Sequence, residues 1–238
     1  MQDRNLMNFG LILGGAMVLS FTIVALTFYN VRSADFITTT GSAKKEVVSD
    51  KVKWVSTISR QARLSTVKDG YAKLDNDLKE VRSFLTSNGI PEGDIDVSPV
   101  FMNEIYDNNY QPEKNYNLVQ NIEVQSTDVQ KIDNLAKNTS ALIGKGIIFS
   151  TSGLEYYYSK LPEVRIELLD SAIADAKARA EKLARAGGKK IGALKSASIG
   201  VTQVLSRNSA QVSDYGTYDT SKIEKEIMVT VKGSFQLK

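Results

Sequence analysis

Residues 51–85 read KVKWVSTISRQARLSTVKDGYAKLDNDLKEVRSFL, and the hydrophobic period changes along this stretch. At its start, Val52, Trp54 and Ile58 share one parity, which predicts a strand with a single buried face. From Val67 to Leu85 the apolar residues recur at alternating spacings of four and three, which predicts an amphipathic helix. A strand followed by such a helix indicates a domain that packs both kinds of element around one core.

The same reading extends over the chain beyond residue 35. It predicts further strands near 37–41, 96–106, 117–125, 147–158, 191–206 and 223–237, and further helices near 127–143 and 163–186. The order β-β-α-β-β-α-β-α-β-β, with hairpin connections, predicts an α+β fold of mainly antiparallel sheet or sheets with three helices packed on one face. Two similar halves that share a sheet are an alternative that the spacing leaves open.

The N-terminal segment Phe9–Tyr29, FGLILGGAMVLSFTIVALTFY, contains no charged residue. As a helix, these residues span about 30 Å, which is the thickness of a bilayer's hydrocarbon core. Each of the hydroxyls of Ser20, Thr22 and Thr27 can bond a carbonyl one turn back. We therefore predict an uncleaved membrane anchor over residues 1–34, followed by a single domain over residues 35–238. A cleaved signal segment and a buried core helix are the alternatives, although the apolar run is long for a signal.

The charges that flank this segment do not orient it. Arg4 precedes the span, and Arg32, Lys44 and Lys45 follow it, so the positive-inside rule favours neither side. A short tail, one span and a long domain most often export the domain. We therefore expect the domain on the periplasmic or extracellular side of the membrane.

Composition excludes several classes of function. The 238 residues contain no His and no Cys, which excludes disulfides, thiolate nucleophiles, Ser-His or Cys-His catalysis and the usual zinc sites. The 30 basic and 27 acidic residues give a net charge of only +3. We therefore expect no nucleic-acid partner, because nucleic-acid binders concentrate basic residues on one face.

Two motifs resemble catalytic or metal-binding motifs but are better explained by local structure. Glu92, Asp94 and Asp96 crowd three carboxylates together but lack the further ligands of a calcium loop, so we interpret them as a solvated turn. Ser65 and Lys68 match S-x-x-K without its companion motifs, and Ser65 or Thr66 is expected to cap the following helix. We predict no catalytic, cofactor-binding or metal-binding residue, and no cofactor.

Two basic pairs, Lys44-Lys45 and Lys189-Lys190, flank predicted strands. Charges there discourage pairing between the exposed edges of sheets, which is our interpretation of both pairs. Contact of the first pair with anionic lipid headgroups is the alternative.

Tyrosines supply the candidate interaction surface. The predicted hairpin tip YDNNYQPEKNY, with its flanking strand residues, presents Tyr106, Tyr110 and Tyr116 among polar residues, and Tyr is a favoured residue at protein interfaces. We predict these three as partner-binding residues. In the triplet 156–158, strand geometry sends Tyr156 and Tyr158 to one face and Tyr157 to the other, which strand propensity or an interface would each explain.

Several segments resemble the SIMPL-domain family, in the same order. The opening ITTTGSA of residues 37–43 is similar to the family's V-x-G-x-G-x-A start, although Thr39 stands where the family often has Gly. FLTSNGIPEGDIDVSP of residues 84–99 resembles the L-x-x-x-G-I-x-x-x-D-I-x-T segment. Further likenesses lie in residues 146–149, 170–184 and 190–192, so the resemblance covers nearly the whole chain beyond the anchor.

This resemblance implies an α+β fold, residence in the bacterial envelope, self-assembly, and a link to oxidative-stress defence, and it implies no catalytic residue. Our first hypothesis is a non-enzymatic, membrane-tethered envelope protein that forms homo-oligomers or docks a protein partner. The alternative is a hydrolase or ligand-processing enzyme of the envelope that uses carboxylates, which requires two acidic residues in one cleft with at least one raised pKa.

Overall fold

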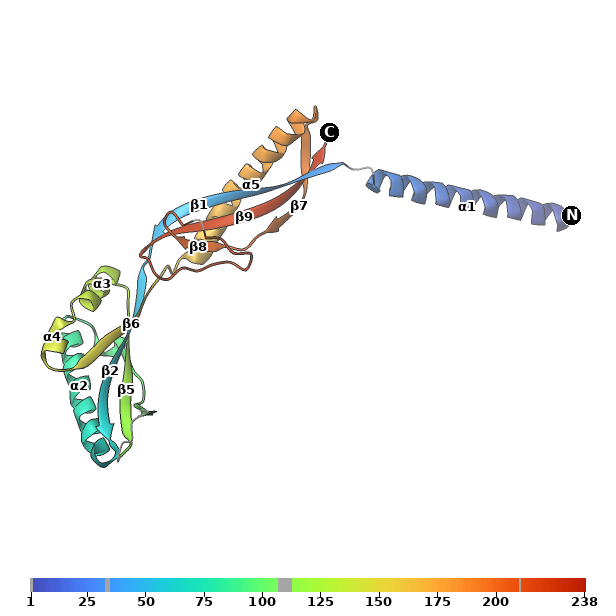
Figure 1. Cartoon of the computed structure of the whole chain (residues 1–238). Coiled ribbons are helices and arrows are strands. Elements are labelled where there is room, and N and C mark those ends of the chain that lie inside the picture. The colour runs from blue at the N-terminus through green and yellow to red at the C-terminus, as the bar shows by residue number, and fades with distance from the viewer. Residues whose placement is uncertain (1, 33–34, 107–112, 210) are drawn as a thin grey trace. The chain divides into compact units, whose positions relative to one another are not determined.

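The structure, a computed structural model, describes residues 2–32, 35–106, 113–209 and 211–238 (Figure 1). Helix α1 (Gln2–Arg32) contains the predicted apolar segment, and its part Asn8–Phe28 is long and apolar enough to cross a membrane. Ser20, Thr22 and Thr27 each donate a hydrogen bond of 2.8 Å to the carbonyl four residues back. Their hydroxyls are thereby satisfied within the helix, as predicted.

The chain divides into two compact units. The first comprises residues 1–43, 168–200 and 229–238, and the second comprises residues 44–167 and 201–228. The boundary predicted between residues 34 and 35, with one domain beyond it, stays a prediction.

A five-stranded antiparallel sheet lies in the second unit. Strand β2 (Lys51–Arg63) pairs with β5 (Asn115–Ser126) on one side and β6 (Ile148–Tyr157) on the other, as Figure 1 shows. The short strands β3 (Ile95–Val97) and β4 (Phe101–Ile105) both pair with β5. They form one predicted strand interrupted at residues 98–100, where Pro99 lacks the N–H needed to continue a ladder.

A four-stranded sheet has the order β1-β9-β7, with β8 also paired to β9. Its strands are β1 (Phe36–Val48), β7 (Ile191–Ile199), β8 (Gln203–Ser206) and β9 (Glu224–Leu237). Strands β7 and β8 both pair antiparallel with β9, and together they occupy the range predicted as a single strand.

Helices α2 (Val67–Ser87), α3 (Val129–Lys137) and α4 (Ser140–Gly144) pack on the five-stranded sheet, and α5 (Leu161–Ala186) contributes to the core of the first unit. The α+β class with antiparallel sheets is confirmed. Beyond α1, the described residues contain four helices, one more than predicted. The extra helix arises because the helix predicted over 127–143 breaks at Asn138, whose side chain donates to the Asn134 carbonyl at 2.7 Å. Asn favours helix ends over helix interiors for this reason.

The core of the second unit lies between the five-stranded sheet and its helices. Val52, Trp54 and Ile58 are buried on one face of β2, as the alternation predicted, and the indole N–H of Trp54 donates to Thr151 Oγ1 at 3.2 Å. Strand β5 adds further buried apolar side chains, and the helices add theirs: Leu74, Val81 and Leu85 from α2, Val129, Ile132 and Leu135 from α3, and Leu142 from α4.

The core of the first unit depends on small residues. Ala172, Ala176, Ala180 and Ala184 recur every four residues along α5 and are all buried. They let β1 approach the helix so closely that a Cβ added to Gly41 would lie 2.2 Å from the Ala172 carbonyl oxygen. The glycine of the ITTTGSA segment and the alanine-rich helix are therefore two halves of one packing contact.

Candidate functional site

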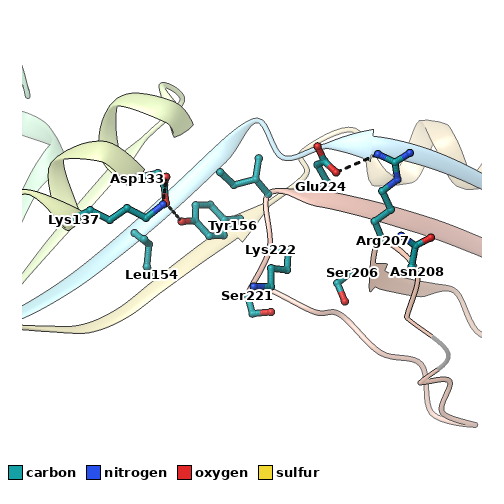
Figure 2. Close-up of a pocket in the computed structure, with 11 residues that line it drawn as sticks. Asp133, Lys137, Leu154, Tyr156, Ser206, Arg207, Asn208, Ser221, Lys222 and Glu224 are labelled. Atoms are coloured by element: carbon teal, nitrogen blue, oxygen red, sulfur yellow. Dashed lines mark hydrogen bonds and ion pairs between the residues drawn. The ribbon is translucent and has the colours of Figure 1, made fainter.

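A pocket of about 730 Å³ lies in the second unit, where four segments that are distant in sequence meet (Figure 2). Helix α3 and strand β6 form one wall. The end of β8 with the turn after it, and the residues that lead into β9, form the other. The lining residues are Asp133, Lys137, Leu154, Tyr156, Ser206, Arg207, Asn208, Ser221, Lys222, Ile223 and Glu224.

At one end of the pocket, Asp133 is only 7% exposed and accepts two hydrogen bonds. The Tyr156 hydroxyl donates to Oδ1 at 2.5 Å, and Lys137 Nζ, one helical turn away, donates to Oδ2 at 2.6 Å. The bonds from Lys137 and Tyr156 hold the pKa of Asp133 below its ordinary value and outweigh the effect of burial. Burial and the neighbouring carboxylate raise the pKa of the Tyr156 phenol. At neutral pH this end therefore holds a carboxylate, an ammonium and a protonated phenol.

At the other end, Arg207 makes two ion pairs. Its Nη1 lies 3.4 Å from Glu224 Oε2, and its Nε lies 3.3 Å from Glu46 Oε1. The next residue, Asn208, has a φ of 63°, a left-handed conformation that Asn tolerates better than most residues. This bend closes the turn that brings Arg207 and Asn208 to the pocket.

Figure 2 shows Lys222 and Ser221 between the end of the pocket that holds Asp133 and the end that holds Arg207. The backbone around them is held by Lys225, a fully buried lysine whose ammonium donates to the carbonyls of Asp219 and Lys222. Burial lowers the pKa of Lys225, and the nearby Asp219 carboxylate opposes that effect. Asp219 in turn accepts a hydrogen bond of 2.8 Å from the Ser221 N–H. The segment 219–225 is thus fixed by its own polar contacts.

The pocket brings together two carboxyl groups, Asp133 and Glu224, but Asp133 is not in the form that a general acid requires. General acid catalysis by a carboxyl group needs a raised pKa, so that the proton is present at neutral pH. The pKa of Asp133 is lowered, and both of its oxygens already accept hydrogen bonds. The geometry suits binding better than acid catalysis.

The predicted partner-binding tyrosines lie in different environments. Tyr106 follows β4 and is 88% exposed, whereas Tyr116 lies within β5 and is half-buried opposite Ala62 and Glu104. Tyr110 lies outside the described residues. Their role in partner binding stays a prediction.

In the tyrosine triplet, Tyr156 and Tyr157 have different environments, and Tyr158 lies beyond the end of β6. Tyr156 is buried and lines the pocket. Tyr157 is half-buried, with its ring 5.9 Å from that of Tyr218 and its hydroxyl donating to Glu155 at 2.7 Å. That hydrogen bond, followed by burial and nearby negative charge, raises the pKa of Tyr157 to about 12. Tyr157 is therefore held by intramolecular contacts instead of standing free as an interface residue.

The carboxylate cluster and the S-x-x-K match take part in local contacts. Glu92 forms an ion pair with Arg82, and Asp96 accepts a hydrogen bond from the Val97 N–H at 3.0 Å. In the described part of the chain, no group of three or more acidic residues is placed to hold a metal ion. Thr66 occupies the N-cap position of α2, but its hydroxyl accepts a hydrogen bond from the Arg63 N–H instead of from the helix.

Three of the four paired lysines make ion pairs. Lys44 contacts Glu226 at 2.7 Å, Lys45 contacts Glu167 at 2.6 Å, and Lys189 contacts Asp35 at 2.6 Å. Lys44 and Lys45 lie in β1, which is an edge strand of its sheet, as predicted.

Sequence reasoning missed most of the pocket, because its walls come from segments far apart in the chain. One signal was present. Val129, Ile132 and Ala136 define the apolar stripe of α3, and Asp133 falls on that same stripe at position i+4 from Val129. A carboxylate at such a position requires a buried partner, which Tyr156 provides. Lys222 and Arg207, in contrast, lie in and beside a loop and carry no periodic signal.

Comparison with known proteins gives one finding. A family profile described as SIMPL, protein of unknown function (DUF541), matches residues 37–235. The match begins beyond α1 and covers both sheets. No curated protein matches the chain.

Proposed function

The chain belongs to the SIMPL family, and we propose that it is a membrane-tethered protein of the bacterial cell envelope that acts without catalysis, by assembling with copies of itself or by docking a protein partner. We place its domain on the exported side of the membrane. A part in oxidative-stress defence is included in the proposal and rests on the family resemblance alone.

The tether is supported by α1. All the side chains from Asn8 to Phe28 are exposed, and the polar ones at positions 20, 22 and 27 bond their own helix. A stretch of exposed apolar side chains of this length is stable in the hydrocarbon core of a bilayer and costly in water.

The observation that carries the assembly proposal is the edge strand β7. In the described structure β9 is the only strand that pairs with β7, and residues 193–199 are exposed on both faces of the strand. Leu194 is 45% exposed and Ile199 is 59% exposed, and Lys195 is the single charged residue in the strand. Natural edge strands are usually protected by charges, bulges or coverage, because a bare edge recruits another strand. Two copies of the same edge are self-complementary around a twofold axis.

The non-catalytic part of the proposal is supported by the state of Asp133, one of the two carboxyl groups that line the pocket. The enzyme alternative has a specific observation in its favour, since Asp133 and Glu224 line one pocket. Against it stand the lowered pKa of Asp133 and the two hydrogen bonds that occupy its oxygens. These features favour a permanently ionised, structural carboxylate over a general acid.

The assembly proposal is tested by adding charge to the β7 edge. We expect the full chain in detergent micelles to form oligomers by light scattering, and the double variant Leu194→Lys with Ile199→Lys to shift toward monomer. Leu183→Lys is the matched control, because Leu183 is a similarly exposed leucine on α5. A double variant that assembles like the control would show that β7 is not the interface. A wild-type chain that stays monomeric would contradict self-assembly.

The hairpin tyrosines give a second test of the same proposal. Ring burial at an interface contributes about 2 kcal/mol or more, roughly thirtyfold in affinity. Replacing Tyr106 by Ser should therefore weaken assembly or partner capture without loss of fold, because the side chain is almost fully exposed. Changing Glu92, Asp94 and Asp96 to Asn should leave assembly intact. If the variant of Glu92, Asp94 and Asp96 loses activity in cells and the Tyr106 variant keeps it, the assembly proposal fails and the enzyme alternative is favoured.

A further inference from the structure

The proposed function leaves the pocket of Figure 2 unexplained, because assembly through an exposed strand does not need it. We propose that this pocket binds a small organic anion, a carboxylate or phosphate ester carried on a compact apolar group, with Lys222 as the residue that neutralises it.

Three cations and two carboxylates line the pocket. Asp133 pairs with Lys137, and Glu224 pairs with Arg207, which also contacts Glu46 outside the lining. Among the residues that the structure describes, none forms an ion pair with the Lys222 ammonium. Lys222 is itself exposed, so its ammonium is open to a ligand. A cation that lines a recess and has no partner attracts an anion, and this attraction weakens as salt is added.

The pocket also offers hydrogen-bond donors to a ligand. Both oxygens of Asp133 already accept bonds from Tyr156 and Lys137. Donors remain available, because Lys137 and Lys222 have more N–H groups than their contacts use and the Asn208 amide adds two more. These donors suit a ligand that brings oxygens of its own.

The apolar part of the lining defines the other half of the ligand. Tyr156 belongs to the core of the unit, and Leu154 and Ile223 pack against that core while also lining the pocket. A pocket of about 730 Å³ is in the usual range for sites of small organic molecules. A bare inorganic anion would leave these apolar side chains without contact.

The position of Lys222 is fixed independently of its side chain. Its carbonyl accepts a hydrogen bond of 2.8 Å from the buried Lys225 ammonium, and the preceding Ser221 N–H donates to Asp219. The backbone that carries the cation is therefore ordered before any ligand binds, which lowers the entropic cost of binding. A substitution of the Lys222 side chain leaves both of these backbone contacts in place.

The test uses the full chain in phosphatidylcholine nanodiscs and measures binding by isothermal titration calorimetry. Phenylacetate and phenyl phosphate are the two anionic probes and distinguish a carboxylate from a phosphate ligand; benzyl alcohol is the neutral probe, and inorganic phosphate tests charge alone. We expect at least one of the organic anions to bind, about tenfold or more tightly than benzyl alcohol and inorganic phosphate, and to weaken as salt is added. Lys222→Gln should weaken that binding about tenfold or more, and Lys222→Arg should retain most of it.

Lys73→Gln is the matched control, since Lys73 is an exposed lysine on α2 that does not line the pocket. Circular dichroism establishes that each variant is folded. The proposal is overturned if neither organic anion binds, if benzyl alcohol binds as well as the anions, or if Lys222→Gln binds like Lys73→Gln. These results do not depend on oligomeric state, so the pocket and the assembly proposal can fail separately.

Discussion

Asp133 occupies a position in α3 that the helical pattern reserves for an apolar side chain, and two hydrogen bonds make it tolerable there. One comes from its own helix, from Lys137, and the other comes from β6, from Tyr156. Burying a carboxylate without such partners would cost several kcal/mol. The Tyr156–Asp133 bond therefore links α3 to the sheet and defines one end of the pocket.

This arrangement predicts a specific response to acid. The pKa of Asp133 is lower in the folded chain than in the unfolded chain, chiefly through Lys137 and then through Tyr156. The resulting stability is fully present above the unfolded pKa of about 3.9 and is lost as the pH falls through the folded pKa. Asp133→Asn should therefore be less stable at neutral pH but lose less free energy of unfolding between neutral and acid pH, measured by urea denaturation. Tyr156→Phe keeps the carboxylate and should retain more of the acid sensitivity. If the free energy of unfolding falls equally with pH in the wild type and in Asp133→Asn, the assignment of this effect to Asp133 is wrong.

Gly41 is a second residue whose role follows from close approach. A Cβ at this position would meet backbone atoms of Ala172 and Ala176, each at 2.2 Å, and helix backbone cannot move aside as a flexible side chain can. Gly41→Ala should therefore cost about 1–3 kcal/mol or more in thermal or chemical unfolding. Gly153→Ala is the control, because its Cβ would meet only Val55 at 3.9 Å. Similar small losses for both variants would show that α5 and β1 are not so closely packed.

Among the helices and strands, α2 has the hydrophobic period that was predicted, but one of its apolar side chains is less buried than that period predicts. Leu74 and Val81 are buried in the core that contains Trp54, but Leu78, which the spacings of four and three place on the same helix stripe, is only partly buried. Asp77 takes the buried position beside it and accepts a bidentate contact from Arg60 on β2, at 2.5 and 2.7 Å. An ion pair thus lies within the apolar stripe of α2, and Leu78 lies at the edge of that stripe.

The consequence is a ranking of two leucines. Leu74→Ala should cost about 2–5 kcal/mol because it leaves a cavity in the core, whereas Leu78→Ala should cost clearly less. Unfolding can be followed by the fluorescence of Trp54, the single tryptophan in the chain. A loss below roughly 0.5 kcal/mol for Leu74→Ala, as for a surface substitution, would contradict the packing of α2 on β2.

For the whole molecule, α1 is the element on which the tether depends. If its apolar segment is an uncleaved anchor, the full chain should stay with membranes after a high-salt wash and should begin at Met1 by mass spectrometry. Salt removes proteins held by surface charge but not those held by buried apolar side chains. A soluble species that begins near Ser33 or Ala34 would instead identify a cleaved signal segment.

Four features follow from the amino-acid sequence alone: the α+β class, the apolar N-terminal helix, the buried face of β2 and most element positions. These features are recorded locally, as a hydrophobic period of two or 3.6 and as the length of an uncharged run. The sequence also carried the ordered segments of the SIMPL family, whose glycine and alanines prove to form the contact between β1 and α5.

Three features depend on contacts in the folded chain: the break between α3 and α4, the division into two sheets and the pocket. The break depends on the hydrogen bond from the Asn138 side chain to its own helix. Such a bond competes with continuation of the helix, and the hydrophobic period does not show which of the two prevails. The pocket depends on the contact of Asp133 with Tyr156 and on the backbone of Lys222 being fixed by Lys225, while no acidic residue in the described part of the chain pairs with the Lys222 side chain. Such contacts join residues through the fold and not through spacing along the chain, so no local pattern encodes them.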